Sequence, residues 1–172
     1  KLMNDSDSRW AYIQKRRNRI QFIIFSSVIL FLFSCNKKCD IELAQNDFLI
    51  FGHFYGECFG EGCVETFKLT SDKLFEDLND NYTGTDFNFI ELEDDAFEQV
   101  EDLIDYFPNQ LLNESEAILG CPDCADQGGL LIQYSENGTL QSWRIDQSQS
   151  SVPDYLHEFM DKVNEKIYLI NN

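Results

Sequence analysis

The sequence predicts an α+β fold, in which an antiparallel sheet built from two hairpins plus irregular strands is covered by two amphipathic helices. Two observations favour this class. Two pairs of strand-like apolar runs are each joined by a short turn that contains glycine. Two other stretches repeat their apolar residues at helical spacing. Strands joined by short turns pair as antiparallel neighbours, and the helices then bury their apolar stripes against the sheet.

The first predicted hairpin joins DFLIFGHFYGEC to CVETFKLT through the loop FGEG, which lies between Cys58 and Cys63. Gly60 and Gly62 can supply the positive φ angles that a tight loop requires. The next segment, residues 71–91, is acidic and rich in asparagine, and it predicts only short strands at KLFEDL and FNFIEL.

A first helix is predicted over Asp94–Phe107, because Phe97, Val100, Ile104 and Phe107 recur at helical spacing and acidic residues crowd the first turn. A second hairpin is predicted in LLIQYSENGTLQSWRID, where Asn137-Gly138 is typical of a type I′ turn. The last predicted helix follows Pro153 and carries an apolar stripe at Leu156, Phe159, Met160, Val163, Ile167 and Ile170.

The N-terminal residues have the order of a secretory signal peptide. The basic cluster KRRNR is followed from Ile20 to Phe33 by an apolar run whose only polar members are Gln21, Ser26 and Ser27. A run of this length is shorter than the roughly 20 residues that a helix needs to cross a bilayer. A cleaved leader is therefore favoured over a spanning helix, and Met3 is a candidate start.

Leu32-Phe33-Ser34-Cys35 resembles the lipobox of bacterial lipoproteins. The resemblance implies cleavage before Cys35, which then becomes the lipidated first residue of the mature protein. With LFSC, GHFYGECFGEGC, GCPDCADQGG and WRIDQ, the chain is similar to the small lipoproteins of Bacteroidota, a group of unknown activity. That similarity implies a cell-envelope location, as an outer-membrane lipoprotein facing the periplasm or the surface, and brings no catalytic residues.

Three parts follow from this interpretation: a signal peptide over residues 1–34, a polar tether over 35–46 and a single domain over 47–172. Cleavage would leave seven basic and 29 acidic residues, a net charge of −22. A charge of this sign and size disfavours nucleic-acid binding. The predicted partners are the membrane, through the lipid anchor, and a protein of the envelope.

Apart from Cys35, five cysteines remain, and Cys39 in the tether is the expected unpaired one. Cys58, Cys63, Cys121 and Cys124 form two close pairs, and an oxidising envelope favours disulfides. The sequence leaves open whether the two disulfides are local or link one pair to the other. Cys121 and Cys124 have the C-x-x-C spacing of redox motifs, but no helix follows to stabilise a thiolate.

A metal-binding lipoprotein is the alternative function, with zinc held by the four cysteines or calcium held by the acidic loop 77–91. The 57 residues between the cysteine pairs weaken the zinc pattern. From Asn79 the loop places oxygen side chains and Gly84 as an EF-hand loop does, but it ends in Ile90 where glutamate is needed. No cofactor is predicted.

The predicted function is a binding or interaction module that is not an enzyme. No nucleophile elbow, phosphate-binding loop or H-E-x-x-H pattern occurs in the sequence. Phe59 in the first loop could form an exposed patch that binds a partner. Trp143 and Arg144 in the second hairpin are residue types common at protein interfaces, although this tryptophan is more often part of the core. An inhibitor or immunity protein that recognises a basic target is one concrete form of this prediction.

Overall fold

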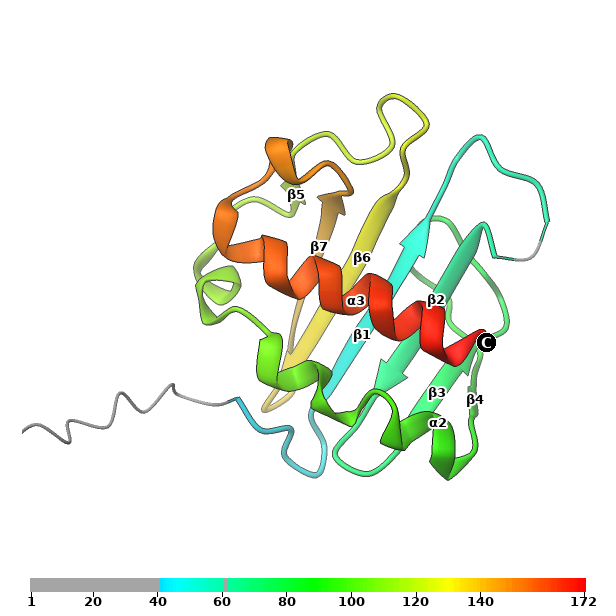
Figure 1. Cartoon of the computed structure of the whole chain (residues 1–172). Coiled ribbons are helices and arrows are strands. Elements are labelled where there is room, and N and C mark those ends of the chain that lie inside the picture. Colours follow the sequence, from blue (N-terminus) through cyan, green and yellow to red (C-terminus); the bar gives the residue numbers. More distant parts are fainter. Residues whose placement is uncertain (1–40, 61) are drawn as a thin grey trace, which may run out of the picture. The chain divides into compact units, whose positions relative to one another are not determined.

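The computed structural model describes residues 41–60 and 62–172, which belong to one compact unit over Asp40–Asn172. This part of the chain has the predicted α+β fold (Figure 1). Cys35, the signal peptide and most of the predicted tether lie outside the described residues. Ile41 and Leu43 pack against the core, so the packed chain begins before the Asn46 end predicted for the tether.

One sheet of seven strands has the order β4-β3-β2-β1-β6-β7-β5. The strands are β1 (Phe48–Phe54), β2 (Val64–Leu69), β3 (Leu74–Asp77), β4 (Phe89–Glu91), β5 (Ile118–Leu119), β6 (Gly129–Glu136) and β7 (Thr139–Asp146). β1 pairs with β2 and with β6, and β6 pairs with β7, all antiparallel. The short predicted strands at KLFEDL and FNFIEL are confirmed as β3 and β4.

The prediction of a wholly antiparallel sheet is wrong at one edge, where β5 runs parallel to β7. The reason lies in the order of the strands. β6 already has β1 on one side and β7 on the other, so β5 cannot pair with β6 and instead adds to the outer edge of β7. The chain reverses its direction between β5 and β6 and again between β6 and β7, so β5 and β7 run in the same direction.

The main core lies between the sheet and α3 (His157–Ile170), which crosses one face of the sheet (Figure 1). Phe159, Met160, Val163 and Ile167 are buried there, as the apolar stripe predicts. The short 3₁₀ segments η3 (Gln149–Ser151) and η4 (Asp154–Leu156) lead into the helix. Burial of this stripe supplies the hydrophobic free energy that holds the helix on the sheet.

The prediction of one continuous helix over Asp94–Phe107 is wrong. The chain instead forms α2 (Asp94–Glu98) and the 3₁₀ segment η1 (Glu101–Tyr106), followed by η2 (Asn109–Asn113). At the break the Val100 N–H donates to Phe97 O, and the Leu103 N–H donates to Val100 O. A β-branched residue at the break and the absence of basic residues in the last turn both weaken a continuous α-helix.

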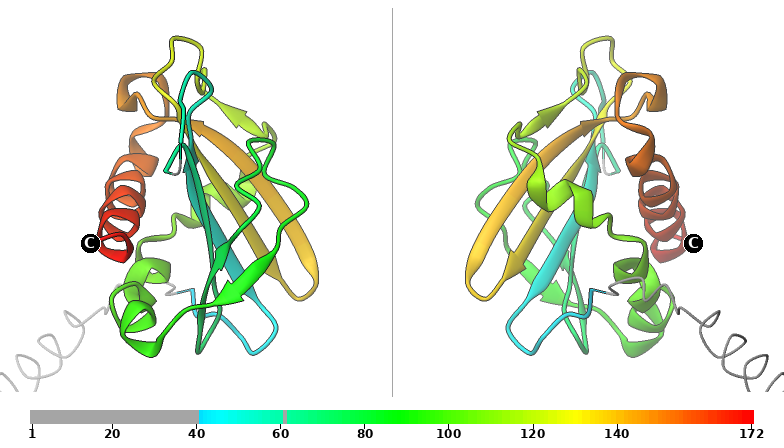
Figure 2. Two further views of the ribbon diagram at one scale, coloured as in Figure 1. Left: turned by 90° about the vertical axis from the view of Figure 1, so that its right-hand side faces the viewer. Right: turned by 90° about the vertical axis from the view of Figure 1, so that its left-hand side faces the viewer.

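Figure 2 shows the segment between β3 and β4 on the face of the sheet opposite α3. A smaller apolar cluster lies apart from the main core. Ile50, Phe54 and Leu131 form it. Gln133 donates from Nε2 to Gly84 O at 3.1 Å and fixes the segment on the sheet. Gly84 has φ +69°, a conformation that other residues rarely adopt, and an added Cβ would lie 2.7 Å from Leu131 Cδ2, so a side chain here would strain the backbone and displace Leu131.

Candidate functional site

The structure contains two local disulfides, which are the Cys58–Cys63 and Cys121–Cys124 pairs. The first closes the loop between β1 and β2, and the second closes a turn that precedes β6. In residues 41–60 and 62–172, no group of three or more His, Cys, Asp or Glu side chains could hold a metal ion. The four thiols that the zinc alternative requires are therefore used in pairs and lie in two separate loops.

The predicted calcium loop is held by its own hydrogen bonds. Asn81 Oδ1 accepts from the Thr83 N–H and hydroxyl, and Asn79 donates from Nδ2 to Asp86 O. Asp77 Oδ1 accepts from the Asn88 N–H. These contacts are typical of an Asx-type turn, so the oxygen-rich pattern is accounted for by turn formation.

Each of the two histidines contacts the backbone through its ring. His53 Nε2 lies 3.0 Å from Gly62 O and 3.4 Å from Glu65 Oε2, which is its cross-strand partner in β2. His157 Nε2 lies 2.8 Å from Gln149 O. Within the described residues, the hydrogen-bond partners of both rings are backbone oxygens, and neither ring bonds to a serine or threonine hydroxyl or to a thiol.

The two predicted interface aromatics have opposite environments. Trp143 is 2% exposed and packs in the main core, as expected for a strand tryptophan. Phe59 is fully exposed on the loop that the Cys58–Cys63 disulfide closes. A free aromatic side chain on a cross-linked loop is one feature of the described surface available for contact with another molecule.

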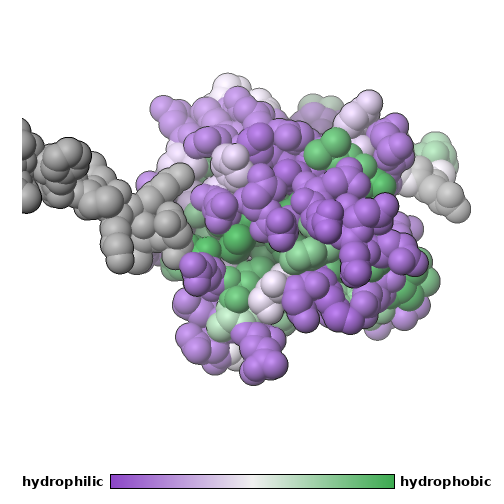
Figure 3. Space-filling model, turned by 60° about the horizontal axis from the view of Figure 1, so that its bottom comes forward, coloured by the Kyte–Doolittle hydropathy of each residue, from purple (hydrophilic) through white to green (hydrophobic). Residues whose placement is uncertain are grey.

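The pocket that best fits a binding role lies between the first described residues and η1. We name it the acidic pocket, and its volume is about 350 Å³. Seen from below, apolar surface lies between hydrophilic side chains beside the start of the described chain (Figure 3). The pocket is lined by Ile41, Glu42, Leu43, Thr70, Ser71, Phe97, Glu101, Asp102, Ile104 and Asp105.

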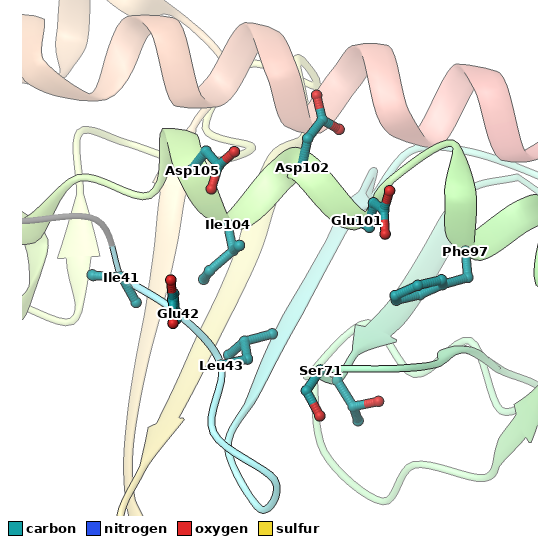
Figure 4. A pocket seen from close by; sticks show the side chains of 10 residues that line it. Ile41, Glu42, Leu43, Ser71, Phe97, Glu101, Asp102, Ile104 and Asp105 are labelled. Atoms are coloured by element: carbon teal, nitrogen blue, oxygen red, sulfur yellow. The ribbon is translucent and has the colours of Figure 1, made fainter.

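Three chain segments build this pocket, and their side chains divide into floor and rim. Ile41 and Leu43 come from the segment before β1, and Ile104 points toward them from η1 (Figure 4). Phe97 of α2 extends the apolar floor toward the Ser71 turn. All four apolar side chains also pack against the main core, so the floor is held by the same contacts that hold the fold.

Carboxylates form the rim, and one of them has a cation partner. Asp102 points toward α3 (Figure 4), where its Oδ1 lies 2.7 Å from Lys166 Nζ. Lys166 is 6% exposed and also donates to Gln99 O at 2.8 Å. Within the described part of the chain, Glu42, Glu101 and Asp105 make no ion pair within 4.0 Å, so their charges remain available to a ligand.

The arrangement suits a cation that carries an alkyl chain. The stem of a lysine or arginine side chain can lie on the apolar floor while its charged head meets the rim. The pocket is not evident from the sequence, because its walls come from residues 41–43, 70–71 and 97–105. A sequence feature that could have indicated the pocket is the acidity of residues 94–105. That acidity was instead explained by the favourable interaction of acidic residues with the dipole of the predicted helix.

Comparison with known proteins gives no family assignment. No protein-family model matches the chain, and a search of curated proteins finds no significantly similar sequence. In the described part of the chain, no helix is both long enough and apolar enough to cross a membrane.

Proposed function

We propose that the protein is a cell-envelope lipoprotein anchored through Cys35, and that its folded domain is a non-enzymatic binding module for a basic segment of a partner protein. The anchor places it in the outer membrane, on the periplasmic or the surface side. The proposal for the anchor rests on the basic cluster, the apolar run and LFSC. The proposal for binding rests on the acidic pocket.

The observation that carries the binding proposal is the combination of an apolar floor with three carboxylates that have no ion pair in the described residues. A surface of many solvated carboxylates alone would attract cations without selectivity. The floor of Ile41, Leu43, Phe97 and Ile104 adds selectivity for a cation with an aliphatic stem. The net charge of the chain, −18 overall, would accelerate the approach of a basic partner.

The anchor would also limit where the pocket can act. Six peptide units separate Cys35 from Ile41, and a fully extended chain of that length spans about 20 Å. The acidic pocket would therefore remain close to the membrane that holds the lipid. Its acidic rim is repelled by anionic headgroups, so a basic protein segment is the more favourable ligand.

Mass spectrometry of the protein purified from its native membrane tests the anchor. The expected mass is that of residues 35–172 plus acyl chains, and Cys35→Ser should abolish both cleavage and acylation. Recovery of a chain that retains residues 1–34 without acyl groups would contradict the lipoprotein proposal. The test is independent of binding.

Titration with a short arginine-containing amphipathic peptide tests the binding proposal. The mature protein in detergent micelles should bind the peptide, and the affinity should fall steeply as salt is raised. The double variant Glu101→Gln/Asp105→Asn should weaken binding by about tenfold or more, since it removes two charge-assisted contacts. The matched double variant Glu158→Gln/Asp161→Asn removes the same charge from α3, outside the pocket lining. Equal effects of the two double variants would contradict a role for the pocket.

A further inference from the structure

A second pocket, unrelated to the acidic one, lies around Arg144 on β7. The guanidinium carbon of Arg144 lies 3.6 Å from the centroid of the Phe54 ring and 4.9 Å from that of Tyr82. Its Nη1 donates to Tyr82 O at 2.8 Å. Stacking on two aromatic rings and one backbone contact fix the plane of the guanidinium, and a fixed plane costs less entropy when a ligand binds.

Arg144 differs from the other cations of the described residues, which are Lys68, Lys73, Lys162 and Lys166. Lys73, Lys162 and Lys166 each lie within 4.0 Å of a carboxylate. Lys68 lies over the rings of Phe75 and Phe89, and burial lowers the pKa of its ammonium group. Arg144 makes no ion pair within the described chain, although the protein has 31 acidic residues.

Asp123, in the turn closed by the Cys121–Cys124 disulfide, is engaged with other donors. Its Oδ2 accepts from the Gly56 N–H at 2.7 Å and from the Tyr82 hydroxyl at 2.9 Å, and its Oδ1 accepts from the Gly128 N–H at 3.0 Å. The carboxylate thus ties three loops together. Its oxygens face these donors, and Arg144 is left without a carboxylate partner.

Asp146, two residues after Arg144 on β7, is also engaged. It is 2% exposed and accepts from the Ser148 N–H at 2.8 Å and from the Cys121 N–H at 2.9 Å. Gln127 donates to it from Nε2 at 3.2 Å. Burial by itself would raise the pKa of this carboxyl, but these hydrogen bonds outweigh the burial and hold the pKa below its usual value.

The pocket beside Arg144 has a volume of about 540 Å³, and we name it the arginine pocket. Tyr82, Ile118 and Pro122 give it apolar walls, and the disulfide-bonded Cys121 and Cys124 continue them. Thr83 contributes a hydroxyl group to the lining. A mostly apolar pocket with a few placed polar groups is the usual form of a small-ligand site.

We propose that the arginine pocket binds a monocarboxylate attached to an apolar or aromatic body. The planar fork of a guanidinium matches the two oxygens of a carboxylate, and an ion held on aromatic rings is already partly desolvated. The walls of Tyr82, Ile118 and Pro122 would contact the apolar body. The net charge of −22 expected for the mature chain repels ligands with several negative charges, such as polyphosphates, more strongly than a ligand with one, so among anions a single carboxylate is opposed least.

Two sources share this chemistry, namely a free organic acid and the C-terminal carboxylate of a peptide. The test uses 3-phenylpropionate and the peptide acetyl-Ala-Ala-Phe, each beside its neutral amide, with the mature protein in detergent micelles. Chemical-shift changes of the backbone amides of Thr83 and Gly120, two lining residues that none of the variants changes, report the binding. Both acids should bind more tightly than their amides, and the tighter acid identifies the source.

Arg144→Gln should weaken binding of the acids by about tenfold or more, with little change for the amides. Because Arg144 also contacts Tyr82, a second variant leaves it in place: Ile118→Glu puts a carboxylate at the exposed lining position next to it in the sheet register. That variant should also weaken acid binding. Lys73→Gln removes a cation outside the pocket and should have no effect.

Equal binding of acids and amides would overturn the proposal, as would unchanged acid binding by Arg144→Gln. Absence of any binding at millimolar concentrations of both acids would also overturn it. None of these results bears on the acidic pocket, because the two pockets share no lining residue. The two proposals can therefore fail separately.

Discussion

The acidic pocket and the arginine pocket differ in where they lie and in what holds them. The acidic pocket lies before the start of β1 and after the end of β2, whereas the arginine pocket lies beside the loops that follow β1 and precede β6. In an antiparallel sheet these are opposite ends of the strands (Figure 1). The proposed site for cations and the proposed site for an anion thus lie at opposite ends of the strands.

The two pockets are also held in place by different kinds of interaction. Apolar side chains on the main core form the floor of the acidic pocket, while the arginine pocket adjoins loops joined by Asp123, Asp146 and the Cys121–Cys124 disulfide. Burial of apolar area can position a segment that lies on the sheet. Loops that extend past the strand ends have less apolar area to bury and depend on polar and covalent ties.

Leu103→Ala is expected to have the largest effect and to act through the acidic pocket. Leu103 is 0% exposed in η1, between the rim residues Asp102 and Asp105. The loss of its side chain should lower the free energy of unfolding by about 2–5 kcal/mol. Urea denaturation measures the loss. Leu140→Ala is the control, because the Leu140 side chain is 55% exposed and its loss should change the free energy of unfolding by less than about 0.5 kcal/mol. A similar small loss for Leu103→Ala would mean that η1 is not held by the core.

Gly128→Ala tests the loops at the other end. Gly128 has φ +73°, and an added Cβ would lie 2.2 Å from Tyr55 Cδ1 and 2.7 Å from Phe54 O. Left-handed strain and overpacking together should cost about 2 kcal/mol or more. Gly138→Ala is the matched control, since Gly138 has φ +78° with no atom within 4 Å of the added Cβ and should lose about 1 kcal/mol. Thermal or urea denaturation distinguishes the two, and equal losses would show that the contact with β1 is not tight.

The difference between the two ends also explains what the sequence could predict. The strands on either side of Asn137-Gly138 and the helix with Phe159 and Val163 depend on turn chemistry and periodicity, both of which are local. The break at Val100 and the pairing of β5 depend on how the whole sheet packs. Asp123 reads as a spacer within C-x-x-C, and its role appears only when Gly56, 67 residues earlier, is brought to it. Both pockets are likewise made of residues distant in sequence.

Asp146→Asn is expected to have an intermediate effect and to depend on pH. The amide cannot replace a carboxylate that accepts from Ser148, Cys121 and Gln127, so we expect a loss of about 1–3 kcal/mol at neutral pH. The pKa of this carboxyl in the folded protein lies below the ordinary 3.8. Its stabilising contribution is therefore complete above about pH 4 and is lost as the pH falls through the lowered pKa of the folded state.

Urea denaturation of the wild-type protein and Asp146→Asn across acidic pH measures this effect. The difference in unfolding free energy between them should shrink as the pH falls. A difference that stays constant down to the lowest usable pH would show that the ionised carboxylate is not what holds the loop. Glu158→Gln, on the exposed side of α3, is the control at neutral pH and should change stability by less than about 0.5 kcal/mol.

Asp102→Asn and Asp105→Asn should give the smallest effects and the sharpest separation of structure from binding. Asp102 neutralises the nearly buried ammonium of Lys166, so Asp102→Asn should cost about 1 kcal/mol of stability, a modest value because Asp102 itself is half exposed. Asp105 makes no ion pair in the described chain, so Asp105→Asn should leave stability within about 0.5 kcal/mol.

For binding of the arginine peptide, the Asp105→Asn variant should have the larger effect and the Asp102→Asn variant the smaller one. Both variants remove one negative charge, so both lose the same long-range attraction, which salt screens. Only Asp105→Asn also loses a contact with the cation, because Asp102 already faces Lys166. At high salt, where the long-range attraction is screened, the Asp105→Asn variant should therefore bind the peptide more weakly than the Asp102→Asn variant. Titration at rising salt measures this difference. If the two converge at high salt, the pocket attracts its ligand by net charge alone, and the rim carboxylates make no specific contact.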